Sequence, residues 1–322
     1  MKLYLDIYRI YLQKKVKGKY AKEPVNFDEI YMILKKRYPN FNHIQGLFQG
    51  LIKSFDEKFY CDSENTKALS FQGPNNWTMK SEQNIISGKF IGGNTGLEYN
   101  VYDNDDANQI THVVQQTEVA SVPFFFMLWV PKSFQVGVLI LQRYSTHNCA
   151  GLFKKLMTEF FKELGYKINF NKFMPKEMRR EYIENCKIEE IRIVRKEDLN
   201  NALQPKLKIL KSSTMVSRIR NTALSTIKLI EEPEYKEQVI NDIEELYPPY
   251  DDKDYSLKFF YIDEKGDKAS STLEGLGEIV PSINLGNECL GKDNLPLWDE
   301  IEKKAEGYLK FIKKDLSYIV EE

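Results

Sequence analysis

A short acidic run is the first feature of this sequence that could do chemistry. Asp103, Asp105 and Asp106 lie close enough together to attract a divalent cation, as a metal-dependent nuclease would require. A calcium loop would also need an oxygen ligand at Ala107 and a glycine at Asn108, and both requirements fail. The pattern therefore favours a solvated loop, and a metal-dependent nuclease stays open as an alternative.

Two further patterns resemble catalytic sites. His147 precedes Cys149 by two residues, just before an expected helix whose N-terminus could activate a thiolate, but no neighbouring residue orients the imidazole. The letters Glu234-Tyr235-Lys236 match a nuclease E-x-K motif, yet they follow a proline at the start of an expected helix rather than lying on a strand. We therefore predict no catalytic residue, no metal ion and no cofactor.

The charge is unevenly distributed along the 322 residues, although the net charge is only -1. Residues 143–228 carry 19 Lys and Arg against 9 Asp and Glu, whereas residues 229–322 carry 11 against 24. Such asymmetry predicts either a surface that binds a polyanion such as nucleic acid or two segments of the chain that attract each other. Both readings stay open from the sequence.

The charge asymmetry is sharpest between Leu199 and Ile230, where six basic residues and no acidic residue occur. We expect a strand at 206–211 with outward lysines, followed by a helix that Ser212, Ser213 or Thr214 caps and that runs to about residue 230. The N–H groups and dipole of such a helix start favour an anion. The predicted DNA-binding residues are Lys206, Lys208, Lys211, Arg218 and Arg220, with Arg179, Arg180 and Arg192 as a second group.

Contacts of this kind would be made to phosphate groups. They give affinity that depends on salt and that does not depend on the base sequence. The chain contains no zinc-finger, RNP or convincing helix-turn-helix motif. The sequence therefore predicts a double-stranded DNA binder without sequence preference rather than a sequence reader.

A long apolar stretch, VPFFFMLWVPKSFQVGVLILQRY, raises the question of a membrane anchor. Its uncharged run from Val119 to Pro131 has 13 residues, whereas a spanning helix needs about 20. Two prolines and Lys132 also argue against a helix. We predict two buried strands, 122–130 and 134–142, with both faces covered, and expect that the chain is not itself inserted in a membrane.

The remaining periodicities predict an α+β fold of two domains, each with a mostly antiparallel sheet packed against helices. The domains are expected at 1–200 and 205–322, with a junction near LNNALQP. A hairpin is expected to turn at Gly92-Gly93-Asn94. Strands are expected at 2–12 and 188–194, and helices at 26–37, 43–55, 150–164, 234–246 and 297–319. The four cysteines form no CxxC pair, which indicates free thiols and a reducing cytoplasm.

The segment DYSLKFFYIDEKGDKASSTLEGLGEIVPSINL resembles the RexA family of phage-exclusion proteins. The shared pattern is a Ser-Leu pair, a strand, Asp-Glu-x-Gly-Asp, a second strand, a glycine and a proline. The order of the elements around it is also similar. The matching positions are Ser256, Leu257, Asp263, Glu264, Gly266, Asp267, Gly277 and Pro281.

The resemblance implies a cytoplasmic homodimer that binds double-stranded DNA without sequence preference. It further implies a sensor or effector of anti-phage defence, acting by phage exclusion or abortive infection and signalling to a membrane-protein partner. The KwaB protein of the Kiwa anti-phage system is similar in role. The resemblance implies no catalytic residues. The alternatives from other classes are the nuclease effector and a protein-interaction module that binds no nucleic acid.

Overall fold

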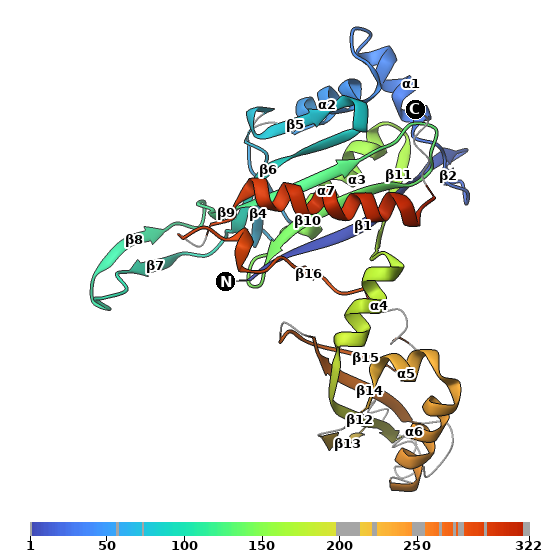
Figure 1. Cartoon of the computed structure of the whole chain (residues 1–322). Coiled ribbons are helices and arrows are strands. Elements are labelled where there is room, and N and C mark those ends of the chain that lie inside the picture. Colours follow the sequence, from blue (N-terminus) through green and yellow to red (C-terminus); the bar gives the residue numbers. More distant parts are fainter. Residues whose placement is uncertain are drawn as a thin grey trace, which may run out of the picture. The chain divides into compact units, whose positions relative to one another are not determined.

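The protein divides into two compact units (Figure 1), Met1–Phe173 with Pro281–Glu322 and Met174–Val280. We call them unit 1 and unit 2. The computed structural model describes residues 2–55, 58–72, 74–197, 213–220, 224–246, 255–263, 266–272, 275, 280–292 and 295–317. Each unit contains an antiparallel sheet packed against helices, which confirms the α+β class.

Unit 1 is built on one large antiparallel sheet. Its strands follow the order β11-β1-β10-β9-β6-β4-β3, with β2 and β16 also paired to β1 and β5 paired to β6. These strands are β1 (Leu3–Val16), β2 (Lys19–Tyr20), β3 (Tyr60–Cys61), β4 (Lys67–Ser70), β5 (Trp77–Lys80), β6 (Ile85–Asn94), β9 (Ala120–Trp129), β10 (Gly137–Tyr144), β11 (Tyr166–Lys172) and β16 (Ile283–Asn284). A separate ribbon of β7 (Tyr99–Tyr102) and β8 (Ile110–Val114) projects from this sheet (Figure 1).

Helices cover both faces of the large sheet. They are α1 (Asp28–Arg37), α2 (His43–Ser54), α3 (Ala150–Glu163) and α7 (Trp298–Asp315), with 3-10 turns at Pro74–Asn76, Ser81–Gln83 and Asn287–Cys289. Phe126 of β9 packs against Phe153 of α3, with 5.3 Å between ring centroids. Trp129 of the same strand lies under Lys313 of α7. Because alternate residues of a strand point to opposite faces, α3 and α7 lie on opposite sides of β9.

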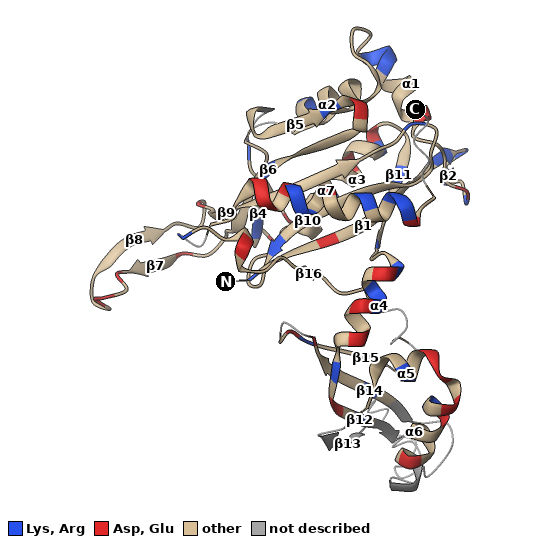
Figure 2. Ribbon diagram, viewed as in Figure 1, with Lys and Arg blue, Asp and Glu red and all other residues tan. Residues whose placement is uncertain are grey.

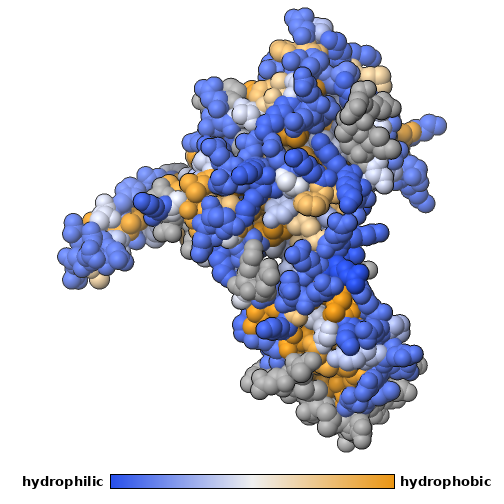
Figure 3. All heavy atoms as spheres, viewed as in Figure 1, coloured by the Kyte–Doolittle hydropathy of each residue, from blue (hydrophilic) through white to orange (hydrophobic). Residues whose placement is uncertain are grey.

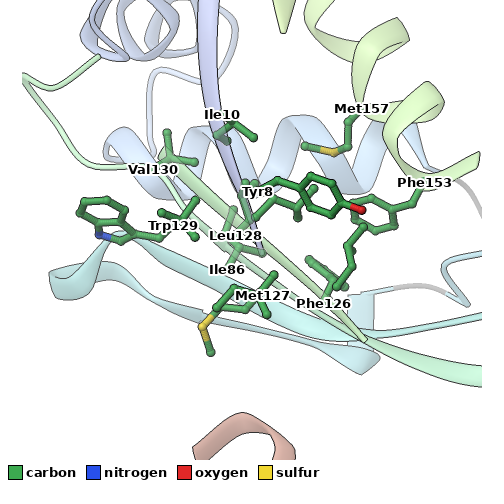
Figure 4. Close-up of a cluster of buried hydrophobic side chains, with 14 of the residues drawn as sticks. Tyr8, Ile10, Ile86, Phe126, Met127, Leu128, Trp129, Val130, Phe153 and Met157 are labelled. Carbon is green, nitrogen blue, oxygen red and sulfur yellow. The ribbon is translucent and has the colours of Figure 1, made fainter. Parts of the chain in front are cut away.

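The apolar stretch forms the centre of this sheet, as the sequence predicts. Strands β9 and β10 pair with each other and lie between β1 and β6. Figure 4 shows the resulting core, in which Phe126, Phe153 and Met157 gather on one side of the strands and Trp129 points to the other. Residues 124–130 of this stretch are all at most 3% exposed. In the described part of the chain, no helix is long and apolar enough to cross a membrane.

The prediction of a hairpin turn at Gly92-Gly93-Asn94 is wrong, because these residues continue strand β6. A Cβ atom on Gly93 would lie 1.8 Å from the carbonyl oxygen of Ala120, and one on Gly92 would lie 2.6 Å from Cys149 Sγ. The glycines therefore allow β9 and the start of α3 to approach β6 closely, which is a packing role rather than a turn.

The chain divides elsewhere than at the expected junction near residue 200. It leaves unit 1 after Phe173 and returns at Pro281. Strand β16 then pairs with β1, with Ile283 opposite Leu5 and Asn284 opposite Tyr4. Helix α7 follows and buries Ile301 and three further apolar side chains in the core of unit 1. Sequence patterns could not show this return, since it depends on pairing between the two ends of the chain.

Unit 2 consists of a four-stranded sheet and helices. The sheet has the order β13-β12-β14-β15. Its elements are α4 (Lys176–Asn185), β12 (Lys187–Glu197), β13 (Ser213–Arg220), α5 (Thr226–Glu231), α6 (Pro233–Leu246), β14 (Tyr255–Ile262) and β15 (Lys268–Thr272). The prediction of a helix from about residue 212 to 230 is therefore wrong for residues 213–220. These residues form a strand that pairs with β12.

Candidate nucleic-acid interface

One face of the sheet in unit 2 is buried against helices. Leu257, Phe259 and Tyr261 of β14 alternate inward, as do Ile191 and Ile193 of β12, and all five are at most 7% exposed. They pack with Leu229 of α5 and with Val239 and Ile243 of α6. The side chains of the intervening residues on β12 and β14 must therefore lie on the opposite, outer face.

The outer face carries a row of basic positions across three strands. Arg192 of β12 pairs with Arg218 of β13 on one side and with Lys258 of β14 on the other. Directly paired residues of antiparallel strands share a face, so these three positions share the outer face. Lys258 is exposed and Arg192 is 33% exposed, while β13 is described by its backbone alone.

Phe260 of β14 orients the cations of this row. The guanidinium carbon of Arg192 lies 3.8 Å from the centroid of the Phe260 ring, and Lys258 Nζ lies 5.5 Å from it. A cation over an aromatic face is attracted by the ring quadrupole, by about 0.5–1 kcal/mol at an exposed site. The Phe260 ring thus holds both side chains on the outer face of the sheet.

A carboxylate on the same face offsets part of this charge. Glu190 accepts a hydrogen bond from Arg192 Nε, and its register partner on β13 is Arg220. An arginine has five N–H donors, so the bond to Glu190 engages one of them. The four basic positions therefore outnumber the one acidic position in these two rows of the outer face.

The acidic segment of unit 2 lies on the other side of the sheet. Helices α5 and α6 contain Glu231, Glu234, Glu237 and Asp242, and they pack on the inner face. In the ribbon of Figure 2, acidic residues (red) occur along both of these helices. Since α5 and α6 pack on the inner face, their acidic residues do not cover the basic row on the outer face.

The structure brings some of the predicted DNA-binding residues together and separates others. Arg192, Arg218 and Arg220 lie on the neighbouring strands β12 and β13. Lys206, Lys208 and Lys211 lie outside the described residues. The anion site expected at a helix start near residue 212 does not form, because 213–220 is a strand.

Helix α4 carries the two remaining predicted residues. Arg180 contacts Glu184 at 3.0 Å and Glu231 at 3.1 Å, and these carboxylates raise the pKa of its guanidinium. This arginine is therefore already paired with two anions of its own unit. Arg179 is half-buried, and its guanidinium makes no hydrogen bond or ion pair with the described residues.

Sequence reasoning missed Lys258 and Phe260 as site residues. The signal was present, because the inward alternation of Leu257, Phe259 and Tyr261 places the two residues between them on the outer face. What the sequence could not show is that β14 pairs with β12, which brings Lys258 beside Arg192.

The acidic run at 103–106 forms a turn between β7 and β8. Asp103 Oδ1 accepts from the backbone N–H of Asp105 at 2.8 Å, and Asp106 Oδ1 accepts from that of Asn108 at 2.9 Å. These bonds are typical of Asx turns. Among the residues that the structure describes, no group of three or more His, Cys, Asp or Glu side chains could hold a metal ion.

The structure also shows where the residues of the other two patterns that resemble catalytic sites lie. Cys149 is buried at the start of α3, and this burial raises the pKa of its thiol to about 11, the opposite of activation. His147 Nδ1 lies 2.8 Å from Thr146 Oγ1. Glu234 and Lys236 lie in the first turn of α6, as the sequence predicts.

Comparison with known proteins adds no further assignment. No protein-family model matches this chain, and no match was found among curated proteins.

Proposed function

We propose that this protein binds double-stranded DNA without sequence preference through the outer face of the sheet in unit 2. The observation that carries the proposal is the row formed by Arg192, Arg218 and Lys258 across β12, β13 and β14. Neighbouring strands lie about 4.8 Å apart, so the three positions span about 10 Å. A DNA duplex carries one negative charge per about 1.7 Å of its axis, and several phosphates therefore face such a row.

The chemistry of the row favours phosphate over base contacts. Arginine and lysine bind phosphate oxygens of any sequence, and such contacts position a protein on the duplex without reading it. The cation–π contact with Phe260 keeps the guanidinium of Arg192 oriented, which lowers the entropy lost on binding.

A role in anti-phage defence is part of the proposal. Its support is the resemblance of residues 254–285 to the RexA family and the agreement of that segment with a hairpin. Asp263 N–H donates to the carbonyl of Asp267 at 3.1 Å, and Asp267 N–H donates to Asp263 Oδ1 at 2.8 Å. This turn joins β14 to β15 and so fixes the strand that carries Lys258. We propose a cytoplasmic sensor or effector that signals to a membrane-protein partner.

The proposed homodimer has a suitable surface in the ribbon of β7 and β8. Tyr102 and Ile110 are paired across it and are 49% and 48% exposed. No Lys or Arg occurs from residue 90 to 131. The tip of the β1–β2 ribbon of the same unit has the opposite character, with Lys17 and Lys19 beside an exposed Val16. The acidic ribbon of one copy and the basic ribbon of another are complementary in charge.

DNA binding is tested by fluorescence anisotropy with three unrelated duplexes of equal length at several salt concentrations. We expect equal affinities within about threefold and a linear fall of log K with log salt. Each phosphate contact removed should lower that slope by about 0.9, so Arg192→Ala and Lys258→Ala should each flatten it by about this amount. Lys303→Ala, an exposed lysine of α7, is the matched control and should leave the slope unchanged.

The same assay decides between the proposal and its alternatives. No binding by the wild type at low salt, or equal binding by Arg192→Glu/Lys258→Glu, would overturn the proposal. A protein-interaction module would give that first result. Incubation of supercoiled plasmid with the protein and Mg²⁺ or Mn²⁺ tests the nuclease, and we expect no nicking above that of the buffer.

A further inference from the structure

A second site is suggested by a groove that belongs wholly to unit 1. It has a volume of about 1170 Å³ and is bounded by the end of β1, by α1, by the start of α2 and by the turn from α3 to β11. Ligand sites are commonly concave and mostly apolar, with a few polar groups, and have volumes of about 300–1,000 Å³. This groove is therefore large enough for an organic metabolite.

The wall of the groove is largely apolar. Met32, Ile33 and Leu164 line it, and Met32 is 61% exposed. Tyr31 also borders it, but this residue is only 1% exposed and its hydroxyl group donates to the carbonyl oxygen of Val130, so its ring belongs to the core beneath the groove. The ring of His43 meets that of Tyr31 edge-on at 5.5 Å between centroids. An apolar or aromatic group could pack against these side chains.

Both carboxylates that line the groove are already engaged. Glu29 accepts from Lys14 Nζ at 2.7 Å and from the Tyr166 hydroxyl at 2.9 Å, and the bond from Lys14 lowers the pKa of Glu29. Asp28 Oδ2 accepts from the backbone N–H and the hydroxyl of Ser133, each at 2.8 Å. Neither carboxylate is thus bonded to the other lysines of the groove.

Among the described residues that line the groove, four lysines stand against the carboxylates of Asp28 and Glu29, which leaves a net charge of +2. Lys15 and Lys36 have no side-chain partner there, and both are exposed. Lys35 Nζ is held by the carbonyl oxygens of Pro39 and Phe41 at 2.6 and 3.0 Å, which orients it without neutralising it.

The positive charge of nearby lysines also acts on His43. Burial lowers the pKa of its imidazole, and Lys132 and Lys35 lower it further, with Asp28 acting in the opposite direction. His43 is also the first residue of α2, where the helix dipole adds partial positive charge. The groove therefore has an apolar wall and an excess of positive charge.

We propose that this groove binds a multiply charged organic anion with a planar apolar body, and that nucleoside phosphates are the class that fits. A ligand with a phosphate chain offers several negative charges to these ammonium groups, whereas a ligand with a single carboxylate offers only one. Met32 and Ile33 offer an apolar surface for the base. The site is separate from the proposed DNA interface, which belongs to unit 2.

The test is isothermal titration calorimetry of the full chain with ATP, inorganic triphosphate and adenosine. We expect saturable ATP binding, and affinities at least about tenfold lower for triphosphate and for adenosine, because each lacks half of the recognised chemistry. Lys15→Glu and Lys36→Glu should each weaken ATP binding about tenfold or more. Lys303→Glu should leave it unchanged, as should Arg192→Ala/Lys258→Ala in unit 2.

Several results would overturn the proposal. These are the absence of saturable ATP binding at millimolar ligand, unchanged affinity in both groove variants, and triphosphate binding as tight as ATP. The variants replace exposed lysines, and circular dichroism of each confirms that a lost signal reflects lost binding. Failure of DNA binding in the separate anisotropy assay would leave this result standing, because the two tests use different residues.

Discussion

Ser282 Oγ donates a hydrogen bond to Asp6 Oδ1 at 2.5 Å, although the two residues are 276 positions apart in the chain. Asp6 is 5% exposed and also contacts Lys172 Nζ at 2.9 Å and Arg143 Nε at 3.3 Å. The returning segment of the chain is thus anchored to the first strand by a buried charge. This contact lies next to the pairing of β16 with β1.

Replacement of Asp6 by Ala should destabilise unit 1. The change removes the anion that two cations and a hydroxyl group share, and the loss of charge-assisted hydrogen bonds typically costs about 2–3 kcal/mol. Urea unfolding monitored by tryptophan fluorescence measures it, with Asp105→Ala in the exposed turn as the control. Equal urea midpoints for the two variants would show that Asp6 does not stabilise unit 1 by this amount.

A chain that ends at residue 200 should fail to fold, although residue 200 is the domain boundary expected from the sequence. Such a chain lacks α7, whose Ile301, Ala305, Leu309 and Ile312 are each at most 2% exposed. Their loss would leave one face of the large sheet uncovered in water, and exposed apolar surface of that extent leads to aggregation. Gel filtration and near-ultraviolet circular dichroism check this, and a monomeric native-like spectrum would contradict it.

Residues 174–280 provide the complementary control. They form unit 2 with a core of their own, so this piece should be monomeric and show a cooperative thermal transition. A non-cooperative transition would mean that unit 2 depends on unit 1.

The contrast between these pieces shows which features the sequence could predict. The apolar stretch of β9 and β10 was predictable, since its composition alone requires burial on both faces. The helix expected from residue 212 was not excluded by periodicity, because Val216 and Ile219 fit a helical stripe. The β-branched residues of this segment also suit a strand, and the pairing of 213–220 with β12 decides the outcome.

The candidate interface shows the same limit. The sequence located the basic residues of β12 and β13, because charge density is a local property. The row with Lys258 and the cation–π contact with Phe260 depend on strand register, which is set by pairs of residues more than 60 positions apart. The charge pattern could therefore predict a basic surface but not its geometry.

Gly93→Ala should destabilise the large sheet strongly. The added Cβ would lie 1.8 Å from the carbonyl oxygen of Ala120, so β6 and β9 would have to separate, at a cost of about 3 kcal/mol. Gly151→Ala is the control, since no atom lies within 4 Å of its Cβ position and alanine favours a helix by about 0.5–1 kcal/mol. Thermal unfolding should therefore shift in opposite directions for the two variants.

Iodoacetamide at pH 8 should label Cys61 and spare Cys149. Cys61 is exposed, whereas burial raises the pKa of Cys149 to about 11 and so keeps its thiol protonated below that pH. Only the thiolate reacts, so labelling of Cys149 should rise as pH approaches 11 or when urea unfolds the protein. Peptide mass spectrometry measures each site, and rapid labelling of native Cys149 at pH 8 would show an activated thiol.

The ribbon of β7 and β8 provides the test of self-association. An isolated two-stranded ribbon is marginally stable in water, and this one exposes Tyr102 and Ile110 next to each other. Coverage by a second copy would bury both side chains. We therefore expect the wild type to be a dimer in multi-angle light scattering and Tyr102→Ser/Ile110→Ser to be monomeric with an unchanged circular dichroism spectrum.

Charge should control the same assembly. The ribbon is acidic and its expected counterpart, the β1–β2 ribbon, is basic, so higher salt should weaken the dimer by screening. Gln109→Ala, an exposed polar change on the same ribbon, should leave the dimer intact. A wild type that stays monomeric at high protein concentration, or a double variant that stays dimeric, would assign the exposed ribbon to another role.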